Sequence, residues 1–321
     1  MPPPDIGIPL SKSKIPSRNG TVKTLGRMKM AVLVMAGFPL TLHSAPLRFA
    51  VSDQPATLQL SASQESSGIA VSQRKPGLLW IANDGGNGPD LYLAGTDGSY
   101  QGTLHINGAV NVDWEDMDSF VWNGRPWLLV ADTGDNAARR NFCTIYLLPE
   151  PSLPVPGQIS ETVPGRKIVF RYEDGPRDCE AVAADPAGGK ILLISKRANP
   201  PGVYELPLAP EKPGEIQTAR KIGVIHVERP LESPLVPYGN QPTGLSISPD
   251  GSLAAVLTYY GVFLFPHRKG ETWAKTFSKK PQRLAPHRQK QAEAIAFSRD
   301  GKTIFVLSEG TTPPVVAYKA K

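Results

Sequence analysis

Short apolar runs separated by polar turns recur along most of this chain. The most regular set comprises five runs of five residues, at 78–82, 127–131, 191–195, 253–257 and 303–307. A turn rich in Pro, Asp and Gly often precedes the run, as at Pro249-Asp250-Gly251. Short runs with evenly spaced turns predict β-strands. No stretch has a 3.6-residue period long enough to predict a competing helix.

A second pattern precedes each of these runs. Five related segments recur at intervals of roughly 50–65 residues, the spacing of a repeat architecture. They are ESSGIAVS (65–72), DWEDMDSF (113–120), DCEAVAAD (178–185), QPTGLSIS (241–248) and QAEAIAFS (291–298). Each repeat then continues with a turn, the buried run, a polar loop, a third strand and, in most repeats, a more irregular fourth strand.

Repeats of four antiparallel strands predict an all-β fold, a five-bladed β-propeller. The last repeat ends after its third strand, so its fourth strand must come from elsewhere. We expect an N-terminal strand at about residues 57–60 to pair with the last blade, which would close the ring and cover an exposed edge. The alternative is an open sandwich in which the similarity of the segments is accidental.

The third residue of every shared segment carries an oxygen. These ring positions are Ser67, Glu115, Glu180, Thr243 and Glu293. Side chains alternate along a strand, so the first strands of a propeller would bring all five to its axis. Converging carboxylates must protonate, separate around water or bind a cation. Oxygen ligands without His or Cys favour a hard cation, Ca²⁺ before Mg²⁺. The alternative is that polar strand ends simply solvate an open channel.

The shared segments also support a family resemblance. The set ESSGI, DWEDM, DCEAV, QPTGL and QAEAI resembles the SdiA-regulated family of bacterial secreted five-bladed propellers, whose ring positions read Ser, Glu, Glu, Ser, Glu. The calcium-activated apyrases are similar in the same residues. This resemblance implies that the five ring positions surround a calcium ion, with Thr243 keeping the hydroxyl of the usual Ser. It implies no settled activity.

The loops after the buried runs are expected on the same face as the ring, because the second strand runs antiparallel to the first. Loops on a rigid scaffold often carry binding residues. The candidate ligand-binding residues there are Asp84, Asp132, Asp135, Arg139, Lys196, Arg197, Tyr259, Tyr260 and Glu309. Many of these residue types also form ordinary turns, so each could be structural.

Three functions fit these features. The first is a calcium-bearing module that binds a small anionic ligand or a protein partner. The second is a calcium-dependent phosphohydrolase of apyrase-like character, in which Asp84 or Asp132 would position water. The third is a glycosidase, which a metal-filled axis disfavours. No nucleophile elbow or His-rich metal motif is present to name catalytic residues.

The N-terminal residues resemble a secretory leader. Basic residues precede an apolar run at 31–42 and small residues follow, so we expect a signal peptide over 1–45, cleavage near Ala45 and a start at Met28 or Met30. The run is too short for a membrane anchor. The remaining residues 46–321 are expected to form one propeller domain in the periplasm or outside the cell.

The charge of the chain bears on its partners, and its cysteine content on its covalent links. The chain has a net charge of +6, of which the first 45 residues contribute +5, leaving +1 for residues 46–321. That part has no basic stripe with interleaved aromatics, so nucleic acid is not an expected partner, and we expect a monomer. An oxidising compartment permits a disulfide between Cys143 and Cys179, but bonded and free thiols both remain open.

Overall fold

The structure is a computed structural model, and it describes residues 48–52, 54–62, 64–232 and 236–321 of the chain. Strands dominate this part, which contains one short helix, α1 (Trp273–Phe277). The expected leader lies outside the described residues. In the described part, no helix has the length and apolarity that a membrane span requires.

The first two antiparallel units occupy residues 66–172. The first consists of β3 (Ser66–Val71), β4 (Leu78–Asn83), β5 (Asp90–Gly95) and β6 (Tyr100–Ile106). The second consists of β7 (Trp114–Trp122), β8 (Arg125–Asp132), β9 (Cys143–Pro149) and β11 (Arg166–Tyr172). An extra strand, β10 (Ile159–Thr162), pairs in parallel with the outer strand β6.

The remaining units follow in chain order. The third consists of β12 (Cys179–Asp185), β13 (Lys190–Ser195), β14 (Gly202–Pro207) and β15 (Gln217–Val224). The fourth consists of β16 (Gly244–Ile247), β17 (Leu253–Thr258), β18 (Gly261–Pro266) and β19 (Gln282–Arg283). The last contains β20 (Ala292–Phe297), β21 (Thr303–Ser308) and β22 (Pro314–Ala320). Parallel pairing of β11 with β15 joins the second and third units into one sheet.

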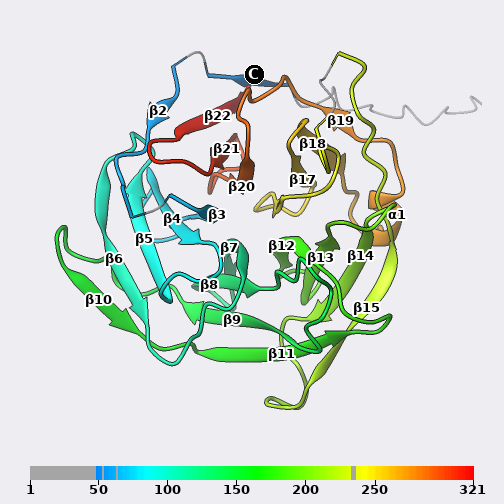
Figure 1. Cartoon of the computed structure of the whole chain (residues 1–321), viewed down its shortest axis with the longest axis horizontal. Helices are drawn as coiled ribbons and strands as arrows, with labels where there is room; N and C mark the ends of the chain where they lie inside the picture. The colour runs from blue at the N-terminus through cyan, green and yellow to red at the C-terminus, as the bar shows by residue number, and fades with distance from the viewer. Residues whose placement is uncertain (1–47, 53, 63, 233–235) are drawn as a thin grey trace, which may run out of the picture. The chain divides into compact units, whose positions relative to one another are not determined.

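The first strands of the units enclose a central axis. Strand β3 contacts β7, β7 contacts β12, β12 contacts β16, β16 contacts β20, and β20 contacts β3 again. Figure 1 looks along this axis, with the outer strands β6, β11 and β15 at the periphery. Sheets arranged radially around an axis form a β-propeller, so the predicted all-β propeller architecture is confirmed.

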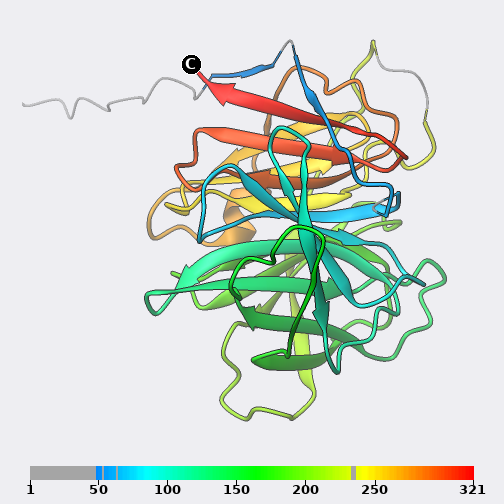
Figure 2. The same ribbon diagram turned by 90° about the vertical axis from the view of Figure 1, so that its left-hand side faces the viewer.

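N-terminal strands complete the last unit, as predicted, but their bounds differ from the predicted 57–60. Strand β1 (Phe49–Val51) pairs antiparallel with the end of β22, and β2 (Ala56–Thr57) pairs with its start. Figures 1 and 2 show this blue segment beside the red strand. The predicted segment 57–60 takes part in this pairing only at its start, where Thr57 pairs with Pro314 and the Leu58 N–H donates to the Pro313 carbonyl oxygen at 2.9 Å. Leu58 and Leu60 are buried in the core with Ile69 and Leu307, so their apolar side chains fill space between units.

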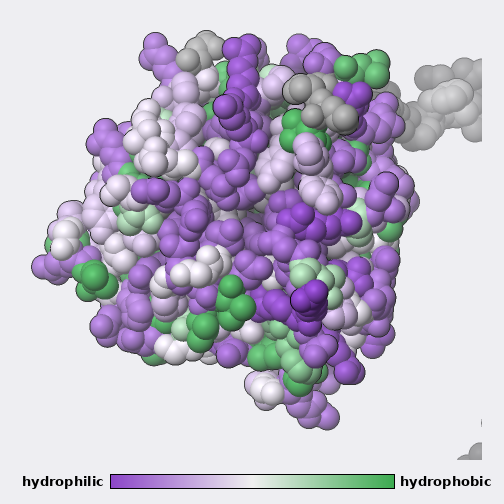
Figure 3. Space-filling view, viewed as in Figure 1, coloured by the Kyte–Doolittle hydropathy of each residue, from purple (hydrophilic) through white to green (hydrophobic). Residues whose placement is uncertain are grey.

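The apolar runs form the core between neighbouring units. Trp80 of β4 and Trp114 of β7 are fully buried in one cluster with Tyr146 of β9. Burial of each such large side chain contributes about 1.5–3 kcal/mol to folding. In contrast, the face shown in Figure 3 is mainly hydrophilic around the axis, and its hydrophobic patches are small and separate.

Both cysteines lie in the core that the second and third units share. Cys143 and Cys179 are buried and present as free thiols. Burial raises the pKa of each thiol to about 12, so neither is an accessible thiolate near neutral pH. The structure therefore assigns them a packing role.

Candidate metal centre at one mouth of the axis

The ring positions lie where the first strands begin. Glu115, Glu180 and Glu293 are each less than 10% exposed. The pairing of first and second strands shifts by one residue at Ser67, Glu115, Glu180 and Glu293, in β3, β7, β12 and β20 respectively. Such a bulge leaves one residue unpaired and redirects its side chain. The bulges thus occur at four of the five positions that the repeat pattern had selected.

The two ring hydroxyls connect adjacent first strands. The Ser67 hydroxyl donates to the carbonyl oxygen of Trp114 at 2.7 Å. The Thr243 hydroxyl donates to the carbonyl oxygen of Ala292 at 2.8 Å. Each hydroxyl oxygen keeps lone pairs after donating its proton, so these contacts are compatible with ligation.

Two groups of carboxylates form around Glu115. One consists of Asp84, Asp113 and Glu115, and the other of Glu115, Asp178 and Glu180. Within each group, one oxygen per residue lies within 4.8 Å of the others. Sequence reasoning named Glu115 and Glu180 as metal ligands and Asp84 as a loop residue, but it missed Asp113 and Asp178. Their signal was present, since both stand two residues before a ring position.

We call the six carboxylates of this region the acidic mouth: Asp84, Asp113, Glu115, Asp178, Glu180 and Glu293. Its donor set fits a hard divalent cation, because every donor is a carboxylate or hydroxyl oxygen. Calcium binds oxygens at about 2.3–2.6 Å, so opposite ligands lie about 4.6–5.2 Å apart. The spacing within the two carboxylate groups therefore suits calcium.

Burial and mutual repulsion raise the pKa values of four carboxylates of the acidic mouth, Asp84, Asp113, Glu115 and Glu180. Burial, followed by the charge of Glu180, raises the pKa of Glu115 well above its usual range. Burial raises the pKa of Glu180 to about 8 although Lys196 opposes the shift. Burial and the neighbouring Asp84 raise the pKa of Asp113 to about 6. A divalent cation would lower all these pKa values by stabilising the ionised forms.

Lys196 supplies an internal cation to the acidic mouth. Its ammonium forms a buried ion pair with the Glu180 carboxylate. It also lies 5.3 Å from the ring centre of Tyr259. The Tyr259 hydroxyl in turn donates to Glu293 at 2.5 Å. The predicted loop residues Lys196 and Tyr259 therefore bridge two ring glutamates, and burial raises the pKa of Tyr259.

Two other basic loop residues, Arg197 and Arg140, are also paired with carboxylates. Arg197 donates from Nε to Asp178 at 2.7 Å. Arg140 forms an ion pair with Asp132 at 2.7 Å. Asp135 accepts hydrogen bonds from the backbone N–H groups of Arg139 and Arg140, and so shapes the loop.

Two further predicted loop residues make contacts that shape loops, and a third lies beside the ring. The Tyr260 hydroxyl accepts from the Val236 backbone N–H at 3.1 Å, so Tyr260 anchors a neighbouring loop. Arg139 contributes its backbone N–H to the Asp135 turn. Burial, followed by a hydrogen bond to Glu293 and the charge of that glutamate, raises the pKa of Glu309 to about 8.

Gly134 is a further residue that sequence reasoning missed. Its backbone passes against the acidic mouth, and a Cβ atom there would collide with the carboxylates of Glu115 and Asp113. Its N–H also donates to the Asp113 carbonyl oxygen at 3.0 Å. A side chain at this position would therefore displace the two carboxylates.

A fully buried carboxylate connects three first strands beyond the ring. Asp116 is 0% exposed and accepts from the N–H groups of Met117, Val182 and Leu245. The side chains of these three residues are buried in separate apolar clusters between the units. Burial raises the pKa of Asp116 while the three N–H donors lower it.

Comparison with known proteins adds no assignment of function. No protein-family model and no curated protein matches the chain, so the resemblance to the SdiA-regulated family stays a prediction. Similar solved structures include the RRP9 WD40 repeats (TM-score 0.37, 13% identity, covering 80% of this chain and 67% of that one). U3-55K has a TM-score of 0.37 and 14% identity over 79% of this chain and 67% of that one. XC5397 from Xanthomonas campestris, described as a gluconolactonase, has a TM-score of 0.44 and 12% identity. The match covers 80% of this chain and 73% of that one.

Proposed function

We propose that the chain is a secreted or periplasmic five-bladed β-propeller that holds a calcium ion in the acidic mouth and binds a ligand or partner through the surrounding loops. The closed circuit of contacts among β3, β7, β12, β16 and β20 supports five blades, since each of these strands begins one antiparallel unit. The proposed location rests on the leader-like sequence of residues 1–45.

The observation that carries the calcium proposal is the pair of carboxylate groups sharing Glu115. Six carboxylates face one internal ammonium, that of Lys196, and one guanidinium that is bound to Asp178. This balance leaves excess negative charge in a buried place, and a divalent cation would neutralise it. Ser67 and Thr243 would complete the set with hydroxyl oxygens.

The pairing of cations favours a binding module over an enzyme. Arg140, Lys196 and Arg197 each form an ion pair with a carboxylate of this region. A phosphohydrolase needs cationic groups directed at the phosphoryl oxygens. Here those groups stabilise the protein's own carboxylates, so they fix loop geometry around the metal.

Calcium-dependent phosphohydrolysis is the second candidate. The same three cations lie on loops beside the acidic mouth, where a metal would weaken their present pairing and release them towards phosphate. Asp84 or Asp132 would then position water, as proposed from the sequence. The pairing seen in this structure is the reason to rank this function second.

The test measures calcium content and stability together. The purified protein is dialysed against metal-free buffer, supplied with calcium and analysed by mass spectrometry for bound metal, and its melting temperature is compared with that in EGTA. We expect about one calcium ion per chain and stabilisation of about 2.7 kcal/mol at a hundredfold excess over Kd. Glu115→Gln should abolish both, whereas Glu205→Gln, on β14, the third strand of its unit, should change neither.

Two outcomes would contradict the proposal. Protein that binds no calcium and melts at the same temperature in calcium and EGTA would refute the metal centre. Calcium-dependent release of phosphate from a nucleoside diphosphate, lost in Glu180→Gln, would replace the binding module by the phosphohydrolase.

A further inference from the structure

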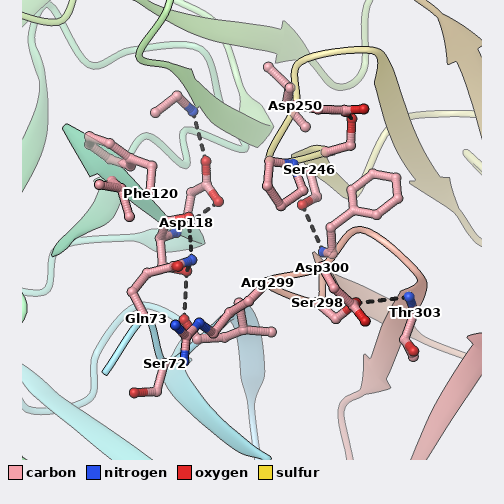
Figure 4. Close-up of a pocket in the computed structure, with 18 of the residues that line it drawn as sticks. Ser72, Gln73, Asp118, Phe120, Ser246, Asp250, Ser298, Arg299, Asp300 and Thr303 are labelled. Atoms are coloured by element: carbon pink, nitrogen blue, oxygen red, sulfur yellow. Dashed lines mark hydrogen bonds between the residues drawn. The ribbon is translucent and has the colours of Figure 1, made fainter. Parts of the chain in front are cut away.

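A second cavity lies at the opposite end of the same first strands. Its volume is about 780 Å³, and residues from β3, β7, β12, β16 and β20 or from the turns after them line it. We call this cavity the opposite mouth. Cavities of about 300–1,000 Å³ are typical small-molecule sites. Figure 4 shows side chains from several strands and turns gathered around it.

The floor of the opposite mouth is a buried carboxylate. Asp118 is 8% exposed. Its Oδ1 accepts from the backbone N–H of Ser119 and its Oδ2 from that of Ala184, each at 2.8 Å. These donors come from two neighbouring first strands and fix the direction of the carboxylate. Each oxygen keeps one further acceptor position, and Asp118 has no ion pair with another described residue.

The lining of the opposite mouth has a negative balance and aromatic walls. Its charged residues are Asp118, Asp185, Asp250, Asp300 and the single cation Arg299. Three phenylalanines complete the lining, Phe120, Phe297 and Phe305. Carboxylates attract a cation, and aromatic faces stabilise cationic and apolar groups alike. An anionic ligand would meet repulsion from all four aspartates.

We propose that the opposite mouth is a second binding site, which accepts a small organic ammonium compound with an apolar body. The ammonium would donate to Asp118, and the apolar body would lie against Phe120 and Phe297. This site is separate from the proposed metal centre, because none of the six carboxylates of the acidic mouth lines it and the buried Asp116 lies between the two along β7.

Isothermal titration calorimetry with benzylammonium tests the proposal, with benzyl alcohol and benzoate as neutral and anionic controls. We expect saturable binding of benzylammonium and weaker binding of both controls. Asp118→Asn should reduce affinity on the order of tenfold, since it removes a charge-assisted hydrogen bond. Binding should be the same in calcium and in EGTA.

A second variant keeps the test decisive if Asp118→Asn fails to fold. Arg299 is exposed at the rim, so Arg299→Ala should fold normally and raise affinity for benzylammonium about twofold to threefold by removing a like charge. Arg220→Ala, on the outer strand β15, is the matched control and should have no effect. Absence of saturable binding, equal binding of benzyl alcohol, or an Arg299→Ala affinity that does not rise would overturn the proposal.

Discussion

Buried carboxylates have different surroundings at the two ends of the propeller axis. In the acidic mouth, Glu115 and Glu180 face other carboxylates and depend on Lys196 for internal compensation. In the opposite mouth, Asp118 is held by two backbone N–H groups and faces a cavity. The difference shows that one repeated strand can build a charged basin at its start and a single oriented acceptor at its end.

Asp116 lies between the two mouths and offers the largest expected effect. Asp116→Ala would leave three backbone N–H groups from β7, β12 and β16 without an acceptor in the core. We expect a loss of about 3–5 kcal/mol in the free energy of unfolding, the usual cost of breaking a buried charged network. Urea denaturation measures it. Asp97→Asn, in an exposed turn, should cost less than about 1 kcal/mol; an equal loss would mean that Asp116 does not connect the strands.

Gly134→Ala would damage the acidic mouth alone. The added methyl group collides with the carboxylates of Glu115 and Asp113. We expect calcium affinity to fall at least about tenfold, equivalent to about 1.4 kcal/mol, as read from the calcium dependence of the melting temperature. Gly223→Ala is the control, because its methyl group would meet only ordinary van der Waals contact. Unchanged calcium binding in Gly134→Ala would place the metal elsewhere.

Lys196→Met tests whether the internal cation competes with calcium. Without the ammonium, Glu180 is free for the metal, so calcium affinity should rise about threefold to tenfold, as expected for a charge-assisted hydrogen bond. Calcium titrations of the two proteins give the ratio. Lys190→Met removes a half-exposed partner of Glu205 instead and should leave calcium affinity unchanged. A weaker affinity in Lys196→Met would show that Lys196 supports the metal centre.

The smallest expected effect is a pH dependence of stability that comes from Asp118 in the opposite mouth. Burial raises the pKa of Asp118 to about 7, while its backbone donors oppose the shift. The charged groups that line the same cavity are Asp185, Asp250, Arg299 and Asp300. Between the unfolded pKa near 4 and about 7 the folded state binds the extra proton, so stability should fall as pH rises through this window.

Melting temperatures of the wild type and Asp118→Asn between pH 5 and pH 8, in saturating calcium, measure this contribution. The difference between the two proteins should change through this range and become constant above about pH 7. A difference that is independent of pH would mean that Asp118 keeps an ordinary pKa.

The repeats made the strand order predictable from the sequence. Apolar runs such as 191–195 and turns such as Pro249-Asp250-Gly251 are local signals, and they became the buried second strands and the turns before them. The closing strands were harder to predict from the sequence, because the pairing of 49–51 and 56–57 with β22 joins segments some 260 residues apart. Local alternation carries no information about that pairing.

The site was predictable only in part for a similar reason. The alternation of side chains along the strands predicted Glu115 and Glu180 as ring residues. It gave no role to Asp116, the acidic residue next to Glu115. Its partners are N–H groups of β12 and β16, which no pattern within β7 reveals. Asp113 and Asp178 gain their importance from the fold, which brings them from separate units to Glu115.

The pairing of β1 with β22 has a consequence for folding. These strands are the first and the last that the structure describes, so the ring can close only after β22 has been synthesised. Until β1 pairs with it, β22 would present an open edge and the buried glutamates would lack their full enclosure. Folding should therefore be slow, as is usual for contacts distant in sequence. A calcium ion added during refolding would stabilise the protein chiefly after β1 and β22 have paired.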